Sequence, residues 1–530
     1  MKKLIVLFLL LTTIIYAQIG RRFIVGYTSY DWQFNGPVYT WCRTDPIANG
    51  VHLYWMWSNF VPSTDRNQRY NFYDCTNHIL NWVDGVNVFT ERSGFGNLDC
   101  DPQTGWAVMS TQQGATGTIR PLVASDQVGG SQGPIGFGWP PITVSFNRAI
   151  HCAMIDCTSQ DSLWYSRIQP WPSWTTPMKV CPPAPDPMFP CHNIAASKIS
   201  NKVVILWTCP EIPGQEPAYY RLSNDGGISW QPPTQLTFPP QETTPSFHIS
   251  SLFAMFDNQD NLHIVASVCD TGYSHGLPAG IWHWCPINNP QWSCIYFYNP
   301  ETIPITPNCG YNAIFATRPS IVQASNSGYL YVAWEQFDNI NYELLTGLSR
   351  ADVWIAESPN NGLTWQNQQP ITTPNTTSKR YPCVGGVDHD TLSIAYLIDS
   401  IAGFENYTQG RATRNPIVLH RIKVPLPASI IEEQSTLYAQ RSLLNAEPNP
   451  FTSHTVIRYS LPINSKTSLE IYDVTGRLVK TLVSRKKSAC EYTATWDGRN
   501  NTGYEVKSGV YFYSLKTADK IISGKIIKTK

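Results

Sequence analysis

The run NLHIVASV at residues 261–268 is an apolar strand with counterparts along most of the chain. Seven such strands start 45 to 67 residues apart; each follows a shorter partner segment, and most precede further short strands. Their sequences are VHLYWMW (51–57), TGWAVMST (104–111), AIHCAMID (149–156), NKVVILWT (201–208), NLHIVASV (261–268), GYLYVAWE (328–335) and DTLSIAYL (390–397). Self-similarity at this period, with about four strands per unit, is the sequence signature of β-propeller blades.

The repeated units predict an all-β fold in which residues 20–425 form a propeller of about seven blades, with six blades as the alternative. The first strand, FIVGYTSY at residues 23–30, has no unit of its own. It is available to close the ring by pairing into the last blade. Stacked solenoids would need shorter and more uniform repeats than these.

Aromatic and turn-forming residues dominate the composition. The chain has 19 Trp, 27 Tyr, 20 Phe, 41 Pro and 34 Gly, and only 14% of its residues are charged, which favours strands and loops over helices. The net charge of zero combines +7 in residues 445–530 (14 Lys and Arg, 7 Asp and Glu) with −7 in residues 1–444. An acidic body argues against nucleic acid as a partner, because phosphate binding needs clustered cations.

Two eight-residue segments, SNDGGISW (223–230) and SPNNGLTW (358–365), share one pattern. The positions that correspond between the two copies are Ser223, Asp225, Gly227 and Trp230 in the first, and Ser358, Asn360, Gly362 and Trp365 in the second. The pattern resembles the Asp-box, or BNR repeat, of sialidase-like β-propellers, with Asn360 where Asp is usual. The resemblance implies a structural role: the Asp or Asn caps a tight turn on an outer hairpin, Gly supplies a positive φ, and Trp packs beneath.

The end of the chain contains three alternating apolar runs separated by turn residues. PNPF (448–451) and TVIRYSLP (455–462) are followed by LEIYDVTGRLVKTLV (469–483) and WDGRNNTGYEVKSGVYFYSL (496–515). The alternation predicts a small antiparallel β-sandwich over residues 445–530. We expect Trp496 near the centre of its core, with these side chains around it: Val456, Ile457, Tyr459, Leu469, Ile471, Leu478, Val479, Val510, Tyr511 and Phe512.

The order and spacing of these runs resemble the type IX secretion (Por) sorting domain, also called a FlgD-type Ig-like domain. The residues that carry the resemblance are Pro448, Asn449, Pro450, Phe451, Tyr472, Asp473, Gly476, Arg477, Trp496, Asp497, Gly498, Gly503, Gly509 and Tyr511. In that family the module is an address read by the secretion machinery, which would then be a partner of this chain. A purely structural Ig-like module is the alternative, because the same fold also serves as an accessory domain.

The N-terminus has the pattern of a secretory signal peptide at residues 1–17. Lys2 and Lys3 precede an apolar run at residues 4–15, and Ala17-Gln18 is a plausible cleavage point. An N-terminal membrane anchor is the alternative, although the run is short for a bilayer span. We therefore expect a secreted or cell-surface protein with no transmembrane segment in the mature chain. A polar linker at 426–444 is expected between the propeller and the C-terminal domain.

Fourteen cysteines suit an oxidising compartment. We predict disulfides that close two loops, one between Cys181 and Cys191 and one between Cys285 and Cys294. A structural zinc site would need paired ligand spacing, and the sequence has no C-x-x-C. The sequence therefore predicts no metal site and no cofactor.

No catalytic residues can be assigned from the sequence. The early arginine motif of sialidases is absent, and Arg43-Thr44-Asp45 stands near its place. The G-x-S-x-G run at 272–276 lacks the following helix that a serine hydrolase needs. The candidate ligand contacts are Trp171 and Trp174, on a proline-stiffened loop, and Arg318, at the start of a blade strand.

The sequence therefore favours an exported, non-catalytic propeller that binds a glycan or a surface protein. A secreted sialidase-like glycoside hydrolase is the alternative. At least two arginines with a Tyr–Glu pair and an Asp around the mouth of the ring would favour the enzyme. A mouth lined by apolar and amide side chains would favour binding.

Overall fold

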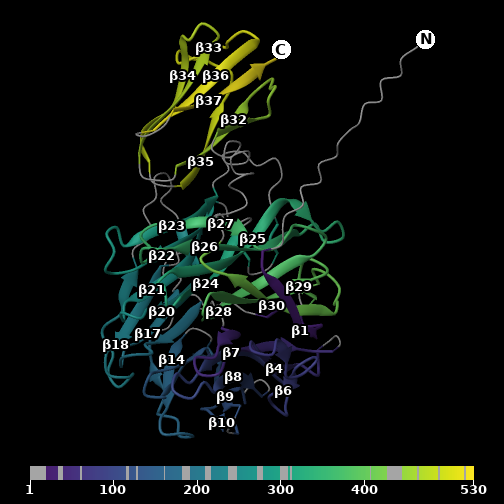
Figure 1. The fold of residues 1–530 in the computed structure, drawn as a ribbon, viewed down its shortest axis with the longest axis vertical. Coiled ribbons are helices and arrows are strands. Elements are labelled where there is room, and N and C mark those ends of the chain that lie inside the picture. Colours follow the sequence, from purple (N-terminus) through teal and green to yellow (C-terminus); the bar gives the residue numbers. More distant parts are fainter. Residues whose placement is uncertain are drawn as a thin grey trace, which may run out of the picture.

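The computed structural model describes residues 19–529 apart from 34–39, 60–62, 115–117, 127–128, 160–161, 182–190, 209–216, 237–246, 271–277, 299–307, 311–312, 406–407, 427–443, 462–464, 488–489 and 518–520 (Figure 1). The predicted signal peptide, the G-x-S-x-G run and most of the linker lie outside these residues. Regular structure in the described part consists of β-strands, with no α-helix. That part also holds no helix long and apolar enough to cross a membrane.

Seven antiparallel sheets precede residue 424 in the described residues, and in each the chain runs outward from an innermost strand. The first three sheets are β2 (Cys42–Thr44), β3 (Gly50–Trp57), β4 (Asn67–Asp74) and β5 (Ile79–Leu80), with β6 (Val86–Asn87) beside β4; β7 (Ser93–Cys100), β8 (Ala107–Gln113), β9 (Arg120–Ser125) and β10 (Ser131–Gln132); and β12 (Ile142–Val144), β13 (Ile150–Asp156), β14 (Leu163–Ile168) and β15 (Met178–Lys179), with β11 (Phe137–Gly138) beside β13.

The next three sheets follow the same order. They are β16 (His192–Ala196), β17 (Val203–Thr208), β18 (Ala218–Ser223) and β19 (Thr234–Leu236); β20 (Phe247–Phe256), β21 (Leu262–Asp270), β22 (Ala279–Trp284) and β23 (Trp292–Tyr298); and β24 (Ala316–Gln323), β25 (Leu330–Tyr342), β26 (Ser349–Ser358) and β27 (Gln366–Pro370). The second strand of each unit is one of the apolar runs that the sequence repeats.

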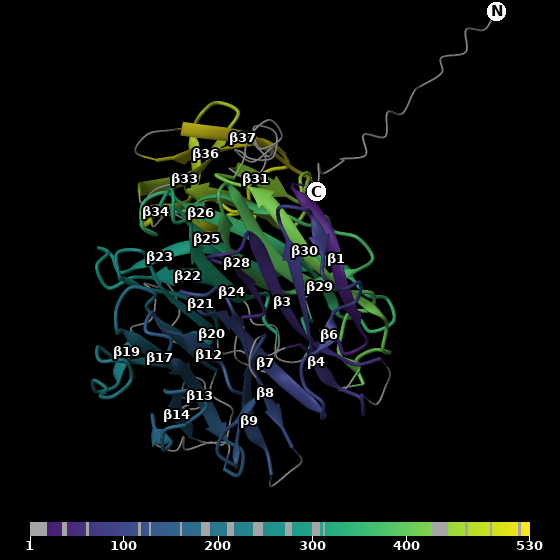
Figure 2. The same cartoon turned by 60° about the horizontal axis from the view of Figure 1, so that its bottom comes forward.

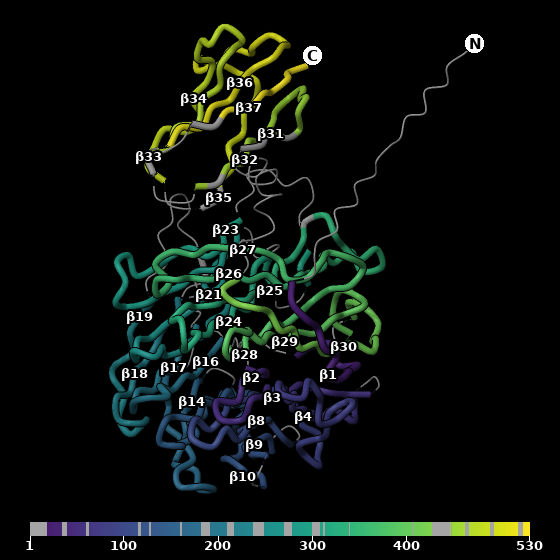
Figure 3. Tube along the Cα trace, viewed as in Figure 1, coloured from purple at the N-terminus to yellow at the C-terminus, as the bar shows by residue number. Residues whose placement is uncertain are grey.

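The seventh sheet joins the two ends of the propeller. It contains β28 (Ser378–Asp388), β29 (Thr391–Asp399) and β30 (Asn415–Lys423), and its outer strand is β1 (Arg21–Thr28), with Phe23 opposite Leu419. The purple β1 therefore lies beside the green β30 although almost 400 residues separate them (Figure 3). The predicted all-β propeller is confirmed, and its first strand pairs into the last blade.

The innermost strands form a closed ring around one axis. Each of β2, β7, β12, β16, β20, β24 and β28 contacts the next, and β28 contacts β2 (Figure 2). Neighbouring blades cover both faces of most strands, so the second strands read as continuous apolar runs instead of alternating ones. Large side chains such as Trp55 and Trp334 are completely buried between blades.

The two segments that resemble the Asp-box form the same turn, between the third and fourth strands of their blades. In the first, Gly227 N donates to Ser223 Oγ (2.8 Å) and Ser229 N donates to Asp225 Oδ1 (2.9 Å). In the second, Gly362 N donates to Ser358 Oγ (2.9 Å) and Thr364 N to Asn360 Oδ1 (2.9 Å). Both glycines have positive φ, 78° and 79°.

The tryptophans of these turns, Trp230 and Trp365, pack inward against the preceding blade. Trp230 meets Tyr165 edge to face at 4.9 Å between ring centroids, and Trp365 meets His283 at 5.4 Å. The segments sit on outer hairpins, far along each sheet from the axis, so their role in the fold is local turn formation and packing.

The predicted disulfides are not formed, and no disulfide joins the cysteines whose side chains are described. Cys294 lies opposite Trp282 in the β22–β23 ladder, whereas Cys285 N bonds to Gln291 O (3.0 Å). Three strand residues, about 10 Å, therefore separate Cys285 from Cys294, which is too far for a disulfide. Cys181 instead accepts a hydrogen bond from Leu163 N through its Sγ (3.4 Å).

Residues 444–528 form two packed sheets. One sheet contains β31 (Leu444–Glu447), β32 (Thr455–Leu461) and β35 (Cys490–Trp496); the other contains β33 (Ser465–Asp473), β34 (Leu478–Lys487), β36 (Gly509–Lys516) and β37 (Ile521–Lys528). Trp496 is fully buried at the centre, as predicted, and its Nε1 donates to Arg499 O (2.9 Å). Its β35 strand contacts β23 of the propeller (Figure 1).

The core prediction is wrong for three residues. Leu478, Val510 and Phe512 are 44%, 36% and 42% exposed. Side chains alternate between the two faces of a strand, so Val510, Tyr511 and Phe512 cannot all face one core, and β36 turns Tyr511, Tyr513 and Leu515 inward. Both sets are apolar, so alternation alone could not show which set faces the core.

Candidate functional site

The ring of innermost strands encloses an axial cavity of about 1030 Å³. Because every unit begins at the axis and continues outward as an antiparallel meander, the innermost strands all run in the same direction. Their final residues therefore gather at one end of the ring. The lining comes from all seven innermost strands and includes Arg43 of β2, Asp99 of β7, Thr143 of β12, Ala195 of β16, Phe256 of β20, Gln323 of β24 and Asp388 of β28.

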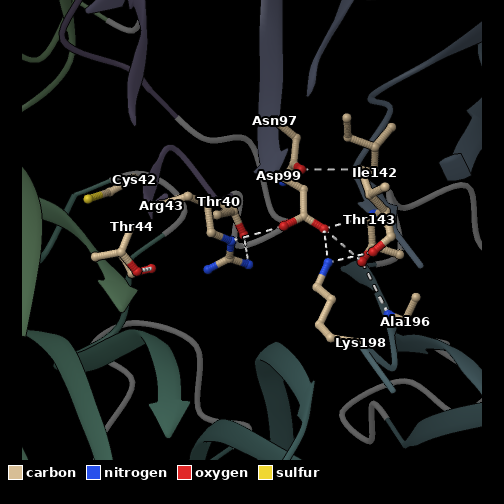
Figure 4. A network of polar contacts seen from close by, with 12 residues as sticks. Thr40, Cys42, Arg43, Thr44, Asn97, Asp99, Ile142, Thr143, Ala196 and Lys198 are labelled. Carbon is tan, nitrogen blue, oxygen red and sulfur yellow. Dashed lines mark hydrogen bonds and ion pairs between the residues drawn. The ribbon is translucent and has the colours of Figure 1, made fainter. Parts of the chain in front are cut away.

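An ion cluster in the wall of this cavity centres on Asp99 (Figure 4). Arg43 Nε lies 3.3 Å from Asp99 Oδ1, and Lys198 Nζ lies 2.7 Å from Oδ2. Oδ2 also accepts hydrogen bonds from Thr143 Oγ1 (3.0 Å) and from Val144 N (2.8 Å). One carboxylate thus links four successive blades, because Lys198 directly follows β16.

Burial and charge act in opposite directions on this carboxyl. Burial alone would raise the pKa of Asp99, but Lys198, Arg43 and the hydrogen bonds together lower it to about 2. The pKa of Asp45 is also lowered, mainly by its hydrogen bond to His52 against the effect of burial, and that of Asp390 by its hydrogen bond to Lys423. These three cavity acids are therefore ionised at neutral pH.

Polar side chains of one innermost strand bond to the backbone of the next, which explains why the ring is polar. Asn97 Oδ1 accepts from Ile142 N (3.3 Å), Thr143 Oγ1 from Ala196 N (3.2 Å), Asn193 Oδ1 from Ala254 N (3.2 Å) and Ser320 Oγ from Val384 N (3.0 Å). The innermost strand is a sheet edge, so the N–H groups on its axis side need partners that no further strand supplies.

The wall also includes apolar and hydroxyl groups that remain accessible. Half-buried Phe256 lies next to Met255, while Thr44, Gln323 and Asn326 add a hydroxyl and two amides. Together with the ion cluster, these groups offer hydrogen-bond donors, acceptors and an aromatic surface within one cavity.

The other end of the ring holds a layer of buried arginines and aromatic rings, with half-buried Trp32 among them, which we call the arginine–aromatic layer. Its members are Trp32, Phe95, Trp139, Arg318, Glu335, Phe337, Arg380, Tyr381 and Phe404. Glu335 is paired with Arg380 through Oε1 and with Arg318 through Oε2 (3.1 Å). Both arginines also lie near the ring of Tyr381, at 4.9 and 5.3 Å.

Backbone bulges bring these residues to the axis. Phe95, Trp139, Arg318 and Tyr381 all have φ between 49° and 57°, which is unusual for residues with a side chain. In β7, β24 and β28 the pairing register shifts at this point. A bulge adds a residue and redirects its side chain, so three blades insert Phe95, Arg318 and Tyr381 in this way, while Trp139 precedes β12 without a register shift.

The structure places the predicted ligand contacts away from the cavity. Arg318 belongs to the arginine–aromatic layer and is only 4% exposed. Trp171 and Trp174 lie in the loop between β14 and β15 and pack on the apolar cluster between their blade and the preceding one, where Trp174 Nε1 donates to Ser131 Oγ of β10 (2.9 Å). None of the three lines the axial cavity.

Sequence reasoning missed Asp99 and Lys198 and did not select Arg43 as a candidate. Arg43 stands near the expected position of the early sialidase arginine, and the structure puts it in the cavity wall. Asp99 and Lys198 have no local signal, because their partners come from other blades.

Several residues of the C-terminal sequence motifs have a structural role. Asp473 Oδ1 accepts from Thr475 N (3.0 Å) and Arg477 N (3.1 Å), which caps the turn that contains Gly476 at φ 81°. Asn449 Oδ1 accepts from Ile527 N (2.8 Å) and holds the PNPF segment to the last strand. Turns likewise contain Asp497, Gly498 and Gly503.

These features agree with a comparison to known protein families. Residues 452–520 match the FlgD Ig-like domain. The two-sheet unit at the end of the chain is therefore a FlgD Ig-like domain, as its motifs predicted. Among curated proteins, no relative matches the chain.

Solved structures with some similarity to this chain include an ulvan lyase, a lectin from Burkholderia pseudomallei and the NanB sialidase from Streptococcus pneumoniae. The ulvan lyase is 9% identical, with a TM-score of 0.48, over 78% of this chain and 99% of its own. The lectin is 10% identical, with a TM-score of 0.45, over 70% of this chain and 98% of its own. The sialidase is 9% identical, with a TM-score of 0.39, over 77% of this chain and 71% of its own. Similarities of this size transfer no function, and the propeller assignment rests on the sheet order itself.

Proposed function

We propose that this protein is an exported or cell-surface binding protein whose propeller holds a glycan in the axial cavity. The composition of the cavity wall supports this proposal. Sugar hydroxyls both donate and accept hydrogen bonds, and the wall supplies hydroxyls, amides and paired charges beside an apolar surface at Phe256. A protein segment of similar polarity is the other class of ligand that such a wall suits.

The state of the cavity acids favours binding over hydrolysis. A glycosidase needs a carboxylic acid whose pKa is raised so that it can protonate the leaving group. Asp45, Asp99 and Asp390 have lowered pKa values instead. The composition of the cavity wall is the single observation that carries the proposal, and the ionised state of these three acids agrees with it.

The sialidase-like alternative finds its residue types in the arginine–aromatic layer. Arg318, Arg380, Glu335 and Tyr381 are the two arginines and the Tyr–Glu pair of the expected enzyme, with Asp399 nearby in the same buried region. Each is at most 4% exposed and Glu335 is paired with both arginines, so in this structure none can touch a substrate. A fluorogenic sialoside assay tests this second candidate.

A glycan array with the full-length chain tests the binding proposal. We expect retained glycans whose affinity falls about three- to tenfold in Phe256→Ala, because an aromatic contact contributes about 1 kcal/mol. Phe512→Ala is the matched control, since Phe512 is exposed on the FlgD Ig-like domain. Equal loss in both variants would contradict glycan binding in the cavity, and hydrolysis of the retained sugar would contradict a binding role without catalysis.

The second part of the proposal concerns delivery. The motif residues and the +7 charge of residues 445–530 support a type IX sorting role for the FlgD Ig-like domain, after export through the signal peptide. The test is deletion of residues 445–530 in a host with a type IX pathway. Unchanged amounts of the truncated propeller in the medium would leave the domain with a structural role only.

A further inference from the structure

The ion cluster of the cavity has more positive charge than its own carboxylate neutralises. Arg43 and Lys198 share Asp99 as their ion-pair partner in the described residues. Their side chains are 23% and 42% exposed, whereas that of Asp99 is 5% exposed. The anion is thus buried beneath two cations that face the cavity.

The other acids of the lining do not cancel this excess, because each has a partner of its own. Asp45 Oδ2 lies 3.3 Å from His52, Asp388 lies 3.5 Å from Arg421 and 2.6 Å from His389, and Asp390 lies 2.6 Å from Lys423. The cluster of Arg43, Asp99 and Lys198 therefore keeps a local charge of about +1 at neutral pH.

Both cations also have hydrogen-bond donors left over. The guanidinium of Arg43 uses Nε for Asp99 and one Nη2 hydrogen for Thr40 Oγ1 (3.2 Å). Of its five N–H groups, three have no partner among the described residues. Lys198 Nζ bonds to Asp99 and to Val144 O (2.5 Å), which leaves one of its three hydrogens.

We infer that Arg43 and Lys198 form a subsite for an anionic substituent, so that the glycan of the proposed function carries carboxylate or sulfate groups. The inference rests on that function and specifies its substrate class. Asp99 holds the two cations in place from below, and the substituent completes their hydrogen bonding from the cavity side. Charge-assisted bonds of this kind are about twice as strong as neutral ones, so they determine selectivity for acidic over neutral sugars.

Matched pairs of oligosaccharides test the subsite. Tetragalacturonate is compared with its methyl ester, and a sulfated carrageenan tetrasaccharide with its desulfated form, by titration calorimetry of the full-length chain at low ionic strength. We expect at least one acidic member to bind about tenfold or more tightly than its neutral counterpart. Arg43→Gln and Lys198→Gln should each remove about tenfold of that affinity without weakening the neutral sugar.

Lys202→Gln is the matched control. Lys202 lies in the same turn as Lys198, but it pairs with Asp260 (3.0 Å) and does not line the cavity. Circular dichroism and thermal unfolding show that each variant is folded.

The outcomes separate the two proposals. If acidic and neutral sugars bind equally well, the anionic subsite is wrong and glycan binding stands. A third outcome is that no oligosaccharide binds, but inorganic sulfate raises the melting temperature of the wild type and of Lys202→Gln and leaves that of the Arg43→Gln, Lys198→Gln double variant unchanged. In that case the subsite binds free anions, and the assignment of an acidic glycan is wrong. If no oligosaccharide binds, and sulfate stabilises the wild type and the Arg43→Gln, Lys198→Gln double variant equally or not at all, both the anionic subsite and the proposed glycan binding are wrong.

Discussion

Replacement of Asp99 by Asn is the sharpest test of how the ring is held together. The folded pKa of about 2, against an ordinary value of 3.8, corresponds to about 2 kcal/mol of stability at neutral pH. Because the folded pKa is the lower one, this stability is present above pH 3.8 and is lost as the pH falls towards 2. Two cations left without a buried counter-charge add to the cost of the substitution.

We therefore expect Asp99→Asn to lower the free energy of unfolding by about 2 to 4 kcal/mol at pH 7. Urea denaturation followed by tryptophan fluorescence measures this difference, and repeating it between pH 4 and pH 2 gives the pH dependence. The difference between wild type and variant should shrink towards pH 2, where Asp99 of the wild type is also protonated. A difference that is below about 0.5 kcal/mol, or that stays constant over this pH range, would refute the account of Asp99 as the link between four blades.

Three further predictions concern the rest of the propeller. Gly362→Ala should lower the melting temperature by several degrees more than Gly328→Ala, because both have positive φ but a Cβ at Gly362 would lie 2.1 Å from the His283 ring and one at Gly328 meets nothing within 4 Å; equal shifts would mean that backbone strain alone matters. Glu335→Gln should cost about 3 to 5 kcal/mol of unfolding free energy in urea denaturation, since two buried arginines lose their shared counter-charge, and a neutral result would show that the arginine–aromatic layer does not depend on this charge. Burial and neighbouring cations lower the pKa of His151 to about 3, so the free energy of unfolding should fall as the pH drops from about 6.5 towards 3. This fall should be smaller in His151→Phe than in the wild type when both are followed by urea denaturation. Identical pH profiles would contradict a neutral buried histidine.

Local signals in the sequence identified the elements of this fold. The repeated apolar strands marked every blade, and the Ser, Asp or Asn and Gly of residues 223–230 and 358–365 form the turns that their spacing indicated. The unmatched first strand pairs with β30. Such predictions succeed because turn capping, positive φ and strand alternation depend on residues a few positions apart.

Predictions that needed the partner of a residue failed. Cys285 and Cys294 are close in sequence, but the β22–β23 register keeps them apart. The sequence predicts both Tyr511 and Phe512 in the core, but these neighbours lie on opposite faces of β36 and only Tyr511 is buried. Arg318 was proposed as a ligand contact, yet Glu335 and Tyr381, which bury it, come from the next strand and the next blade.

The sequence by itself determined that the chain is a ring of repeated antiparallel units followed by a FlgD Ig-like domain, because apolar periodicity and turn chemistry are local. Only the tertiary structure decided where the cavity lies and which charges meet in it. Arg43, Asp99 and Lys198 belong to separate blades and come together only when seven innermost strands close around one axis. Strand alternation shows which residues share a face, but the opposing face is set by sheet register and ring closure.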